Sequence, residues 1–176
     1  MNDLQINTIN RTIGQLMLRV GIMKLRDAQS DFISVSSDNI KLIKAITQLG
    51  IDVVPLDDNF WFTSWDNWRK IIDVLNPIAQ QFNWEAERFD CDNRANLMTA
   101  LTSLIFRVNS CTGLYCDVYD AKTGAYKYRH YANLIVDIDD NVYLWDVDQG
   151  GLTQKITTKE VVMGVNKYIL LNARAY

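Results

Sequence analysis

The chain has 176 residues, of which 48% are hydrophobic and 22% are charged, and its formal net charge is −3. This composition is typical of a globular domain that buries a core of its own, and it excludes a disordered or fibrous chain. A slightly acidic chain without basic clusters is not suited to nucleic acid, and no apolar run reaches the length of a membrane span. We therefore predict a single domain over residues 1–176.

The first 80 residues alternate between patterns typical of helices and patterns typical of short strands. Helices are expected over 4–25, from Ser37 or Asp38 as far as Gly50, and after Ser64. Short strands are expected over 32–36, 51–54 and 60–63. Pro77 is expected to interrupt or restart the helix that follows Ser64. Because no chemical motif stands out, residues 1–80 are interpreted as an N-terminal, helix-rich extension of unknown role.

The second half of the chain begins with a helix and continues with strands. Apolar residues on most sides predict a buried helix over 91–107. Strands are expected over 114–119, 126–137, 142–146 and 165–171. Asp139, Asp140 and Asn141 are typical of a hairpin turn between the second and third of these strands. Helices followed by antiparallel strands predict the α+β class, with a central cysteine-bearing helix packed on an antiparallel sheet.

A cysteine, a histidine and a carboxylate occupy three informative positions in this pattern. Cys91 lies at the start of the buried helix, where Asp90 is a suitable N-cap and the helix dipole favours a thiolate. His130, the one histidine of the chain, lies on a strand, and Asp146 ends the next strand. In a hairpin centred near residue 138, these two residues face one another. The three residues therefore predict a catalytic triad of nucleophile, base and orienting acid.

Three further residues are candidates for supporting roles. Asp148 would point to the same face as Asp146 and is the alternative orienting acid, whereas Asn133 lies on the opposite face from His130. Gln81 is a candidate for oxyanion support, a role that the family resemblance given below implies for a glutamine upstream of the nucleophile. The three cysteines are expected as free thiols. One histidine and three cysteines without paired spacing predict no metal site, and no cofactor motif is present.

These segments also carry a resemblance to known proteins. The chain resembles the core of transglutaminase-like and papain-like cysteine folds in three segments: 89–101, 129–134 and 142–148. It is most similar to small phage-encoded domains of that type and to the C-terminal protease-like domain of a fungal agglutinin. The resemblance spans 83–150 and implies a papain-like core over 81–176. It also implies that Cys91 is the nucleophile, His130 the base and Asp146 the orienting acid.

The function implied by this resemblance is cysteine-dependent acyl transfer, namely hydrolysis of a peptide or isopeptide bond in a peptide or protein substrate. Two alternatives stay open: a protein transamidase, and a non-catalytic phage structural or assembly protein that retains the fold. The latter would form a homo-oligomer or bind a phage structural partner through residues 1–80. The expected location is cytoplasmic, or in the virion for a phage-encoded protein. Neither nucleic acid nor a membrane is expected as a partner.

Overall fold

The structure, a computed structural model, describes residues 33–81 and 90–175 of the chain. These residues belong to the second of two compact units, Ile33–Tyr176, and the first unit is Met1–Phe32. The helix expected over 4–25 lies outside the described residues. Residues 33–80, which we had assigned to an extension, lie in the same compact unit as the residues that follow them.

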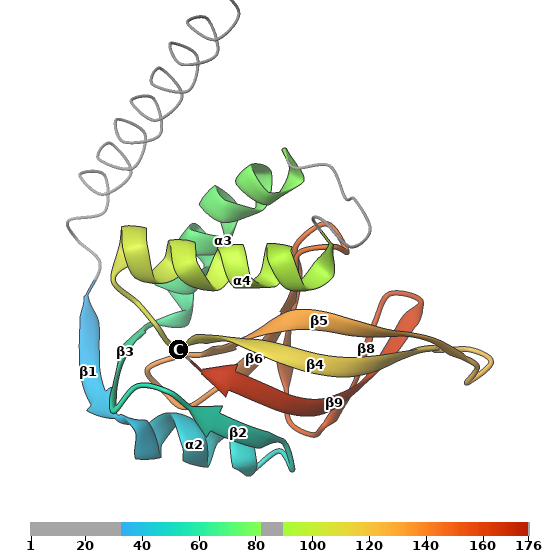
Figure 1. Cartoon of the computed structure of the whole chain (residues 1–176), viewed down its shortest axis with the longest axis horizontal. Helices are drawn as coiled ribbons and strands as arrows, with labels where there is room; N and C mark the ends of the chain where they lie inside the picture. Colours follow the sequence, from blue (N-terminus) through green and yellow to red (C-terminus); the bar gives the residue numbers. More distant parts are fainter. Residues whose placement is uncertain (1–32, 82–89, 176) are drawn as a thin grey trace, which may run out of the picture. The chain divides into compact units, whose positions relative to one another are not determined.

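A seven-stranded sheet is the main element of this unit (Figure 1). Neighbouring strands follow the order β2–β9–β4–β5–β6–β7, and β8 also pairs with β9. The strands are β2 (Asp52–Pro55), β4 (Cys111–Asp120), β5 (Tyr126–Val136), β6 (Val142–Asp146), β7 (Leu152–Ile156), β8 (Glu160–Met163) and β9 (Asn166–Ala175). Only β2 and β9 run parallel among these described pairs, and the other pairs are antiparallel.

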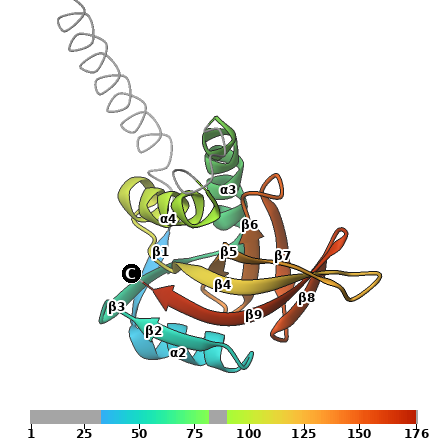
Figure 2. The ribbon, with the colours of Figure 1, turned by 45° about the vertical axis from the view of Figure 1, so that its right-hand side comes forward.

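A two-stranded sheet and three α-helices complete the part of the chain that the structure describes. In the small sheet, β1 (Ser34–Asp38) pairs antiparallel with β3 (Asn59–Thr63). The helices are α2 (Asn39–Thr47), α3 (Trp65–Gln80) and α4 (Cys91–Leu101), and the π-helix η1 (Thr102–Phe106) follows α4 directly. Both views show α3 and α4 on one side of the large sheet and α2 on the other (Figure 1, Figure 2).

The core lies between α2 and the central strands. Leu42 and Ile46 of α2 pack in one buried cluster with Leu114 of β4, Leu134 of β5 and Leu170 of β9. Alternate residues of a strand point to the same face, so the even-numbered positions of β4 and β5 supply this core. Burial of each such side chain stabilises the fold by about 1.5–3 kcal/mol.

On the opposite face of the sheet, α4 is held by a buried amide. Asn133 of β5 is fully buried, and its Nδ2 donates to the backbone oxygen of Ala95 at 2.9 Å and to Thr99 Oγ1 at 3.0 Å. If α4 moved away from Asn133, these buried polar atoms would lose their hydrogen bonds. Each unpaired group would cost about 1–3 kcal/mol of stability. These bonds therefore fix the position of α4, and with it the position of Cys91.

Several local predictions are confirmed. Ser64 caps α3 by accepting from the backbone N–H of Asn67 at 3.3 Å. Gly50, just after α2, has φ of +76°, the left-handed conformation that favours glycine at a helix end. The predicted turn before β6 forms with Asp140 at φ of +63°, and Asp137 Oδ1 accepts the backbone N–H groups of Asp139 and Asn141, each at 2.9 Å.

Other local predictions were wrong. Pro77 lies inside α3 and does not interrupt it. The helix expected over 91–107 ends as an α-helix at Leu101, and Leu104 in the π-helix that follows is 64% exposed rather than buried. The strands β7 and β8 were missed because each is short, and β7 buries only Ile156. β7 therefore has no apolar face that periodicity could detect, and the four residues of β8 are too few for its alternation to stand out.

The predicted fold class, an α+β papain-like core with a helix-rich extension, is corrected by this architecture. The described residues form nine strands and three α-helices, so the unit is mainly β-sheet. The strand β2 belongs to the large sheet, although it lies in the segment that we had assigned to the extension. The sheet is larger than predicted, because β7, β8 and the parallel pairing of β2 with β9 leave no clear signal in the sequence. Among the described residues, no helix combines the length and apolarity needed to cross a membrane.

The close approach of Gly113 in β4 to Tyr131 in β5 gives a test of the packing beneath α4. A Cβ at position 113 would overlap the ring of Tyr131, a side chain that is only 5% exposed. We expect Gly113→Ala to lower the free energy of unfolding by about 1–3 kcal/mol, as overpacking does. Urea unfolding measures this change. In a Tyr131→Ala background the same substitution should cost much less, and an equal cost in both backgrounds would contradict the packing described here.

Candidate functional site

Cys91 is the first residue of α4, and Asp90 is its N-cap. The backbone N–H of Asp90 donates to Asn93 Oδ1 at 3.4 Å, which closes a capping box at the start of the helix. The first turn of a helix carries unpaired N–H groups and the positive end of the helix dipole. Cys91 lies at this positive end, and because the residue is only half-buried it is partly accessible to solvent.

His130 and Asp146 form a buried pair beside this helix start. The His130 Nε2 lies 3.0 Å from Asp146 Oδ1, and the two residues are 5% and 1% exposed. Asp146 Oδ1 also accepts the backbone N–H groups of Asp148 and Gln149, at 3.0 and 3.3 Å. Its Oδ2 accepts the Tyr168 hydroxyl at 2.7 Å. Because both carboxylate oxygens are held, the carboxylate fixes the orientation of the imidazole.

The strand register explains how this pair forms. The hairpin pairs Val136 with Val142 and Asn133 with Trp145, so its centre lies at residue 139 rather than at the predicted 138. Asp146 is therefore displaced by two residues from the position directly across from His130. The two residues still share a face, because side chains two apart in a strand point the same way. A diagonal contact between neighbouring strands is within reach of an imidazole ring.

The charges of the pair follow from these contacts. Burial disfavours the charged form of His130, but its hydrogen bonds to Asp146 and Cys91 outweigh burial and raise its pKa to about 10. Burial likewise works against the charged form of Asp146, but the bonds from His130 and Tyr168 hold its pKa below the ordinary value. At neutral pH the pair is therefore an imidazolium and a carboxylate.

The remaining two cysteines lie in a different environment. Cys111 and Cys116 are both fully buried, and the described cysteines form no disulfide. Burial raises the pKa of Cys111 to about 12, and burial together with the negative charge of Asp146 raises that of Cys116 well above its ordinary value. Cys91 is consequently the one thiol of the chain that combines access to solvent with a neighbouring imidazolium.

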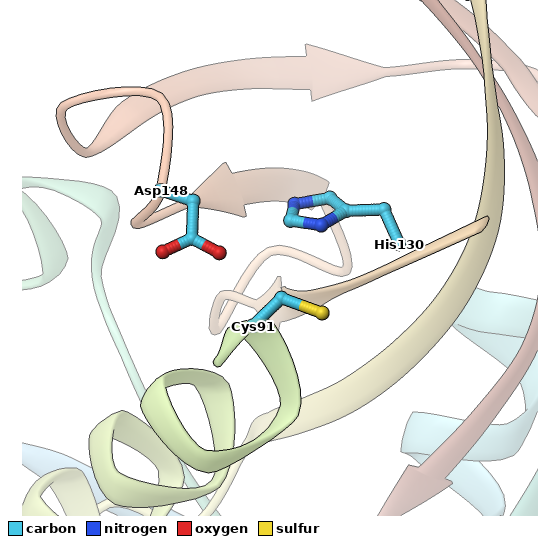
Figure 3. A group of neighbouring side chains, drawn as sticks. All are labelled: Cys91, His130 and Asp148. Carbon is cyan, nitrogen blue, oxygen red and sulfur yellow. The ribbon is translucent and has the colours of Figure 1, made fainter. Parts of the chain in front are cut away.

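Asp148 is close to both reactive groups (Figure 3). Its carboxylate, a ring nitrogen of His130 and the Cys91 sulfur all lie within 4.8 Å of one another. Thiolate, imidazole and carboxylate in this arrangement could hold a zinc-like ion with an open coordination position. The same carboxylate forms an ion pair with Arg94 at 2.8 Å, however, so a metal ion would compete with the guanidinium for Asp148.

The other two predicted supporting residues are Asn133 and Gln81. Asn133 holds α4 through its amide, as described above, and has a structural role. Gln81 is exposed at the C-cap of α3. Its neighbour Gln80 instead reaches the loop between the two acids, where its Nε2 donates to the Val147 backbone oxygen at 2.9 Å.

Three contributors to the site were missed in the sequence analysis: Tyr168, Arg94 and Gln80. Tyr168 reaches Asp146 because β9 pairs with β4. That pairing could not be predicted from the spacing of residues in the sequence. Arg94 lies three residues after Cys91, and residues with this spacing share one face of a helix. Its position near the thiol could therefore have been predicted from the helix alone.

Comparisons with known proteins indicate the fold of this chain but do not assign it to a family. No family model and no curated protein matches the sequence. The chain is similar to the structure described as the PSL1a–E64 complex, at 15% identity and a TM-score of 0.52, over 79% of this chain and 51% of that one. A structure of Polyporus squamosus lectin bound to Neu5Aca2-6Galb1-4GlcNAc matches at 15% identity and a TM-score of 0.48, over 68% and 45%. The chain thus spans about half the length of these neighbours.

These comparisons contradict the predicted family and the function derived from it. The neighbours are lectin chains, and neither is described as a transglutaminase or as a papain-like protease. We therefore withdraw the papain-like and transglutaminase-like assignment. The predicted peptide or isopeptide hydrolase, the transamidase and the phage structural protein are withdrawn with it, because each depended on that family resemblance.

The buried pair predicts a characteristic pH dependence of stability. An imidazole with a raised pKa stabilises the fold fully below its unfolded value of about 6.5, and this contribution is lost as the pH rises toward 10. We expect Asp146→Asn to lower the free energy of unfolding by about 2 kcal/mol at pH 6, the worth of a hydrogen bond to a charged group. Urea unfolding of both proteins should show this difference shrinking between pH 6.5 and 10. A difference that stays constant over this range would contradict the charged pair.

Proposed function

We propose that Cys91 functions as a thiolate nucleophile that forms covalent adducts with soft electrophiles, with His130 as its acid–base partner and Asp146 as the orienting carboxylate. The observation that carries this proposal is the position of the imidazole, which is hydrogen-bonded to Asp146 through Nε2 and has a ring nitrogen within 4.8 Å of the Cys91 sulfur. A thiolate beside an imidazolium at a helix N-terminus is the arrangement that makes a cysteine nucleophilic.

The chemistry needs only groups that lie at the site. With an epoxide, a bond forms between the Cys91 sulfur and an epoxide carbon while the carbon–oxygen bond breaks. The alkoxide that results takes the proton of the His130 imidazolium, which leaves a neutral imidazole next to Asp146. The carboxylate keeps the ring in place through this transfer, since Asp146 is held by Tyr168 and by two backbone N–H groups.

Labelling with iodoacetamide tests the nucleophile, and the other two cysteines serve as internal references. At pH 7 in the presence of EDTA, which removes any metal ion from the thiol, we expect Cys91 to be alkylated about a hundredfold faster than Cys111 or Cys116. Peptide mass spectrometry over a time course measures the three rates. Equal and slow labelling of all three thiols would refute the proposal.

The same assay separates the partners of the thiol. We expect His130→Ala to slow the labelling of Cys91 about a hundredfold, as loss of an acid–base partner does, and Asp146→Asn to slow it by a smaller factor. Arg129→Ala is the matched control, because this exposed neighbour of His130 pairs with Asp117 rather than with the site. Circular dichroism checks that each variant is folded.

E64 provides a second and more selective electrophile. It is an epoxysuccinyl compound that alkylates thiols, and it is present in one of the similar structures. We expect the intact mass of the full chain to rise by one E64 molecule, and we expect Cys91→Ser to abolish this adduct. An adduct that forms equally on Cys91→Ser would place the reactive group elsewhere in the chain.

A further inference from the structure

A second candidate site lies near the other end of α4. A cavity of about 700 Å³ opens between the C-terminal part of α4, the π-helix η1 and the small sheet formed by β1 and β3. Asn96 and Ser103 contribute from the helical side, Trp61 from β3, and Asp57, Arg107 and Asn109 from the loops. Asn96, the lining residue of α4 that is nearest to Cys91 in sequence, follows it by five residues, roughly 7.5 Å along the helix axis. Cys91 is not among the described residues that line this cleft.

The apolar part of the cleft is provided by Trp61, whose side chain is 45% exposed. Its backbone is firmly held, because its N–H donates to Asn109 Oδ1 at 2.7 Å and the residue pairs with Ser36 in the small sheet. The indole is thus a half-exposed aromatic surface on a well-anchored backbone at the edge of a cavity. A tryptophan buries a large area on binding while losing little conformational entropy, so such a position is suited to a ligand.

The polar part of the cleft supplies both donors and acceptors. Asn109 Nδ2 donates to Asp57 Oδ2 at 3.2 Å, which fixes the carboxylate at the rim. Asn96 is exposed on α4 and offers an amide, and Ser103 offers a hydroxyl. Arg107 adds a guanidinium opposite in charge to Asp57, so the rim carries both signs.

The backbone next to the cleft is unusual. The helix changes from α to π geometry at Thr102, and Arg107 then has φ of +56°, a left-handed conformation that is costly for a residue with a Cβ. Single π-turns and strained residues of this kind are often found at functional sites. Here they turn the chain from the helix into the loop that carries Asn109.

We propose that this cleft binds a saccharide, with the indole of Trp61 stacked on the C–H face of one sugar ring. A sugar ring has one apolar face and a rim of hydroxyl groups that both donate and accept, which matches the polar side chains around the indole. A purely apolar ligand would cover the exposed amide of Asn96 and guanidinium of Arg107 without replacing their hydrogen bonds to water. The opposite charges of Asp57 and Arg107 give the rim no net charge, so it favours neither an anionic nor a cationic ligand.

Saturation-transfer NMR on the full chain tests this proposal with a mixture of galactose, mannose and N-acetylglucosamine. We expect saturation to reach the ring C–H groups of at least one sugar, and we expect Trp61→Ala to weaken its binding about tenfold, as loss of an aromatic contact does. Asn96→Ala should also weaken binding, and this exposed helix position tolerates alanine without loss of folding.

Tyr126→Ala is the matched control, because it removes an exposed aromatic side chain from β5 outside the lining of the cleft. Binding that is lost with Trp61 and Asn96 but kept in this control supports the proposal. No saturation transfer to any of the three sugars, or transfer that persists unchanged in Trp61→Ala, would overturn it. Since Cys91 does not line the cleft, its alkylation should leave sugar binding unchanged.

Discussion

The buried bond between His130 and Asp146 is the interaction on which the candidate site depends. Two groups that carry charge lie almost completely out of water, and such a pair is stable only when its remaining polar atoms are satisfied. Tyr168 and two backbone N–H groups supply that satisfaction from β9 and from the loop after β6. Three separate parts of the chain must therefore assemble correctly before the imidazole takes its position beside Cys91.

Much of the local structure could be predicted from the sequence, because the signals are local. Ser64 and Asp90 mark helix starts through their capping side chains, and the Asp-Asp-Asn turn sets the hairpin that brings His130 close to Asp146. What escaped prediction is non-local: Tyr168 meets Asp146 through the pairing of β9 with β4, and β2 joins the sheet through a parallel crossover. The family assignment failed for a related reason, since a short pattern of residues does not determine the order of strands.

Helix α4 connects the two candidate sites and has different properties at its two ends. Its N-terminus directs the helix dipole at a thiol, whereas its C-terminus leaves regular α-helical geometry and borders a cleft. The amide of Asn133 holds the middle of this helix on the sheet, so both ends are positioned by the same contact. Both candidate sites therefore border this helix, which contributes Cys91 to the first site and Asn96 to the cleft.

The edge of the large sheet beside β9 is divided between two strands. β2 pairs with residues 172–175 of β9, and β8 pairs with residues 166–169, so each edge strand is only four residues long. The first ends in Pro55, which has no N–H to donate, and the second begins with the charged Glu160. Short, interrupted edges with a proline or a charge resist the addition of further strands. The sheet is thereby protected against edge-to-edge aggregation along this side, although its central strands are long and apolar.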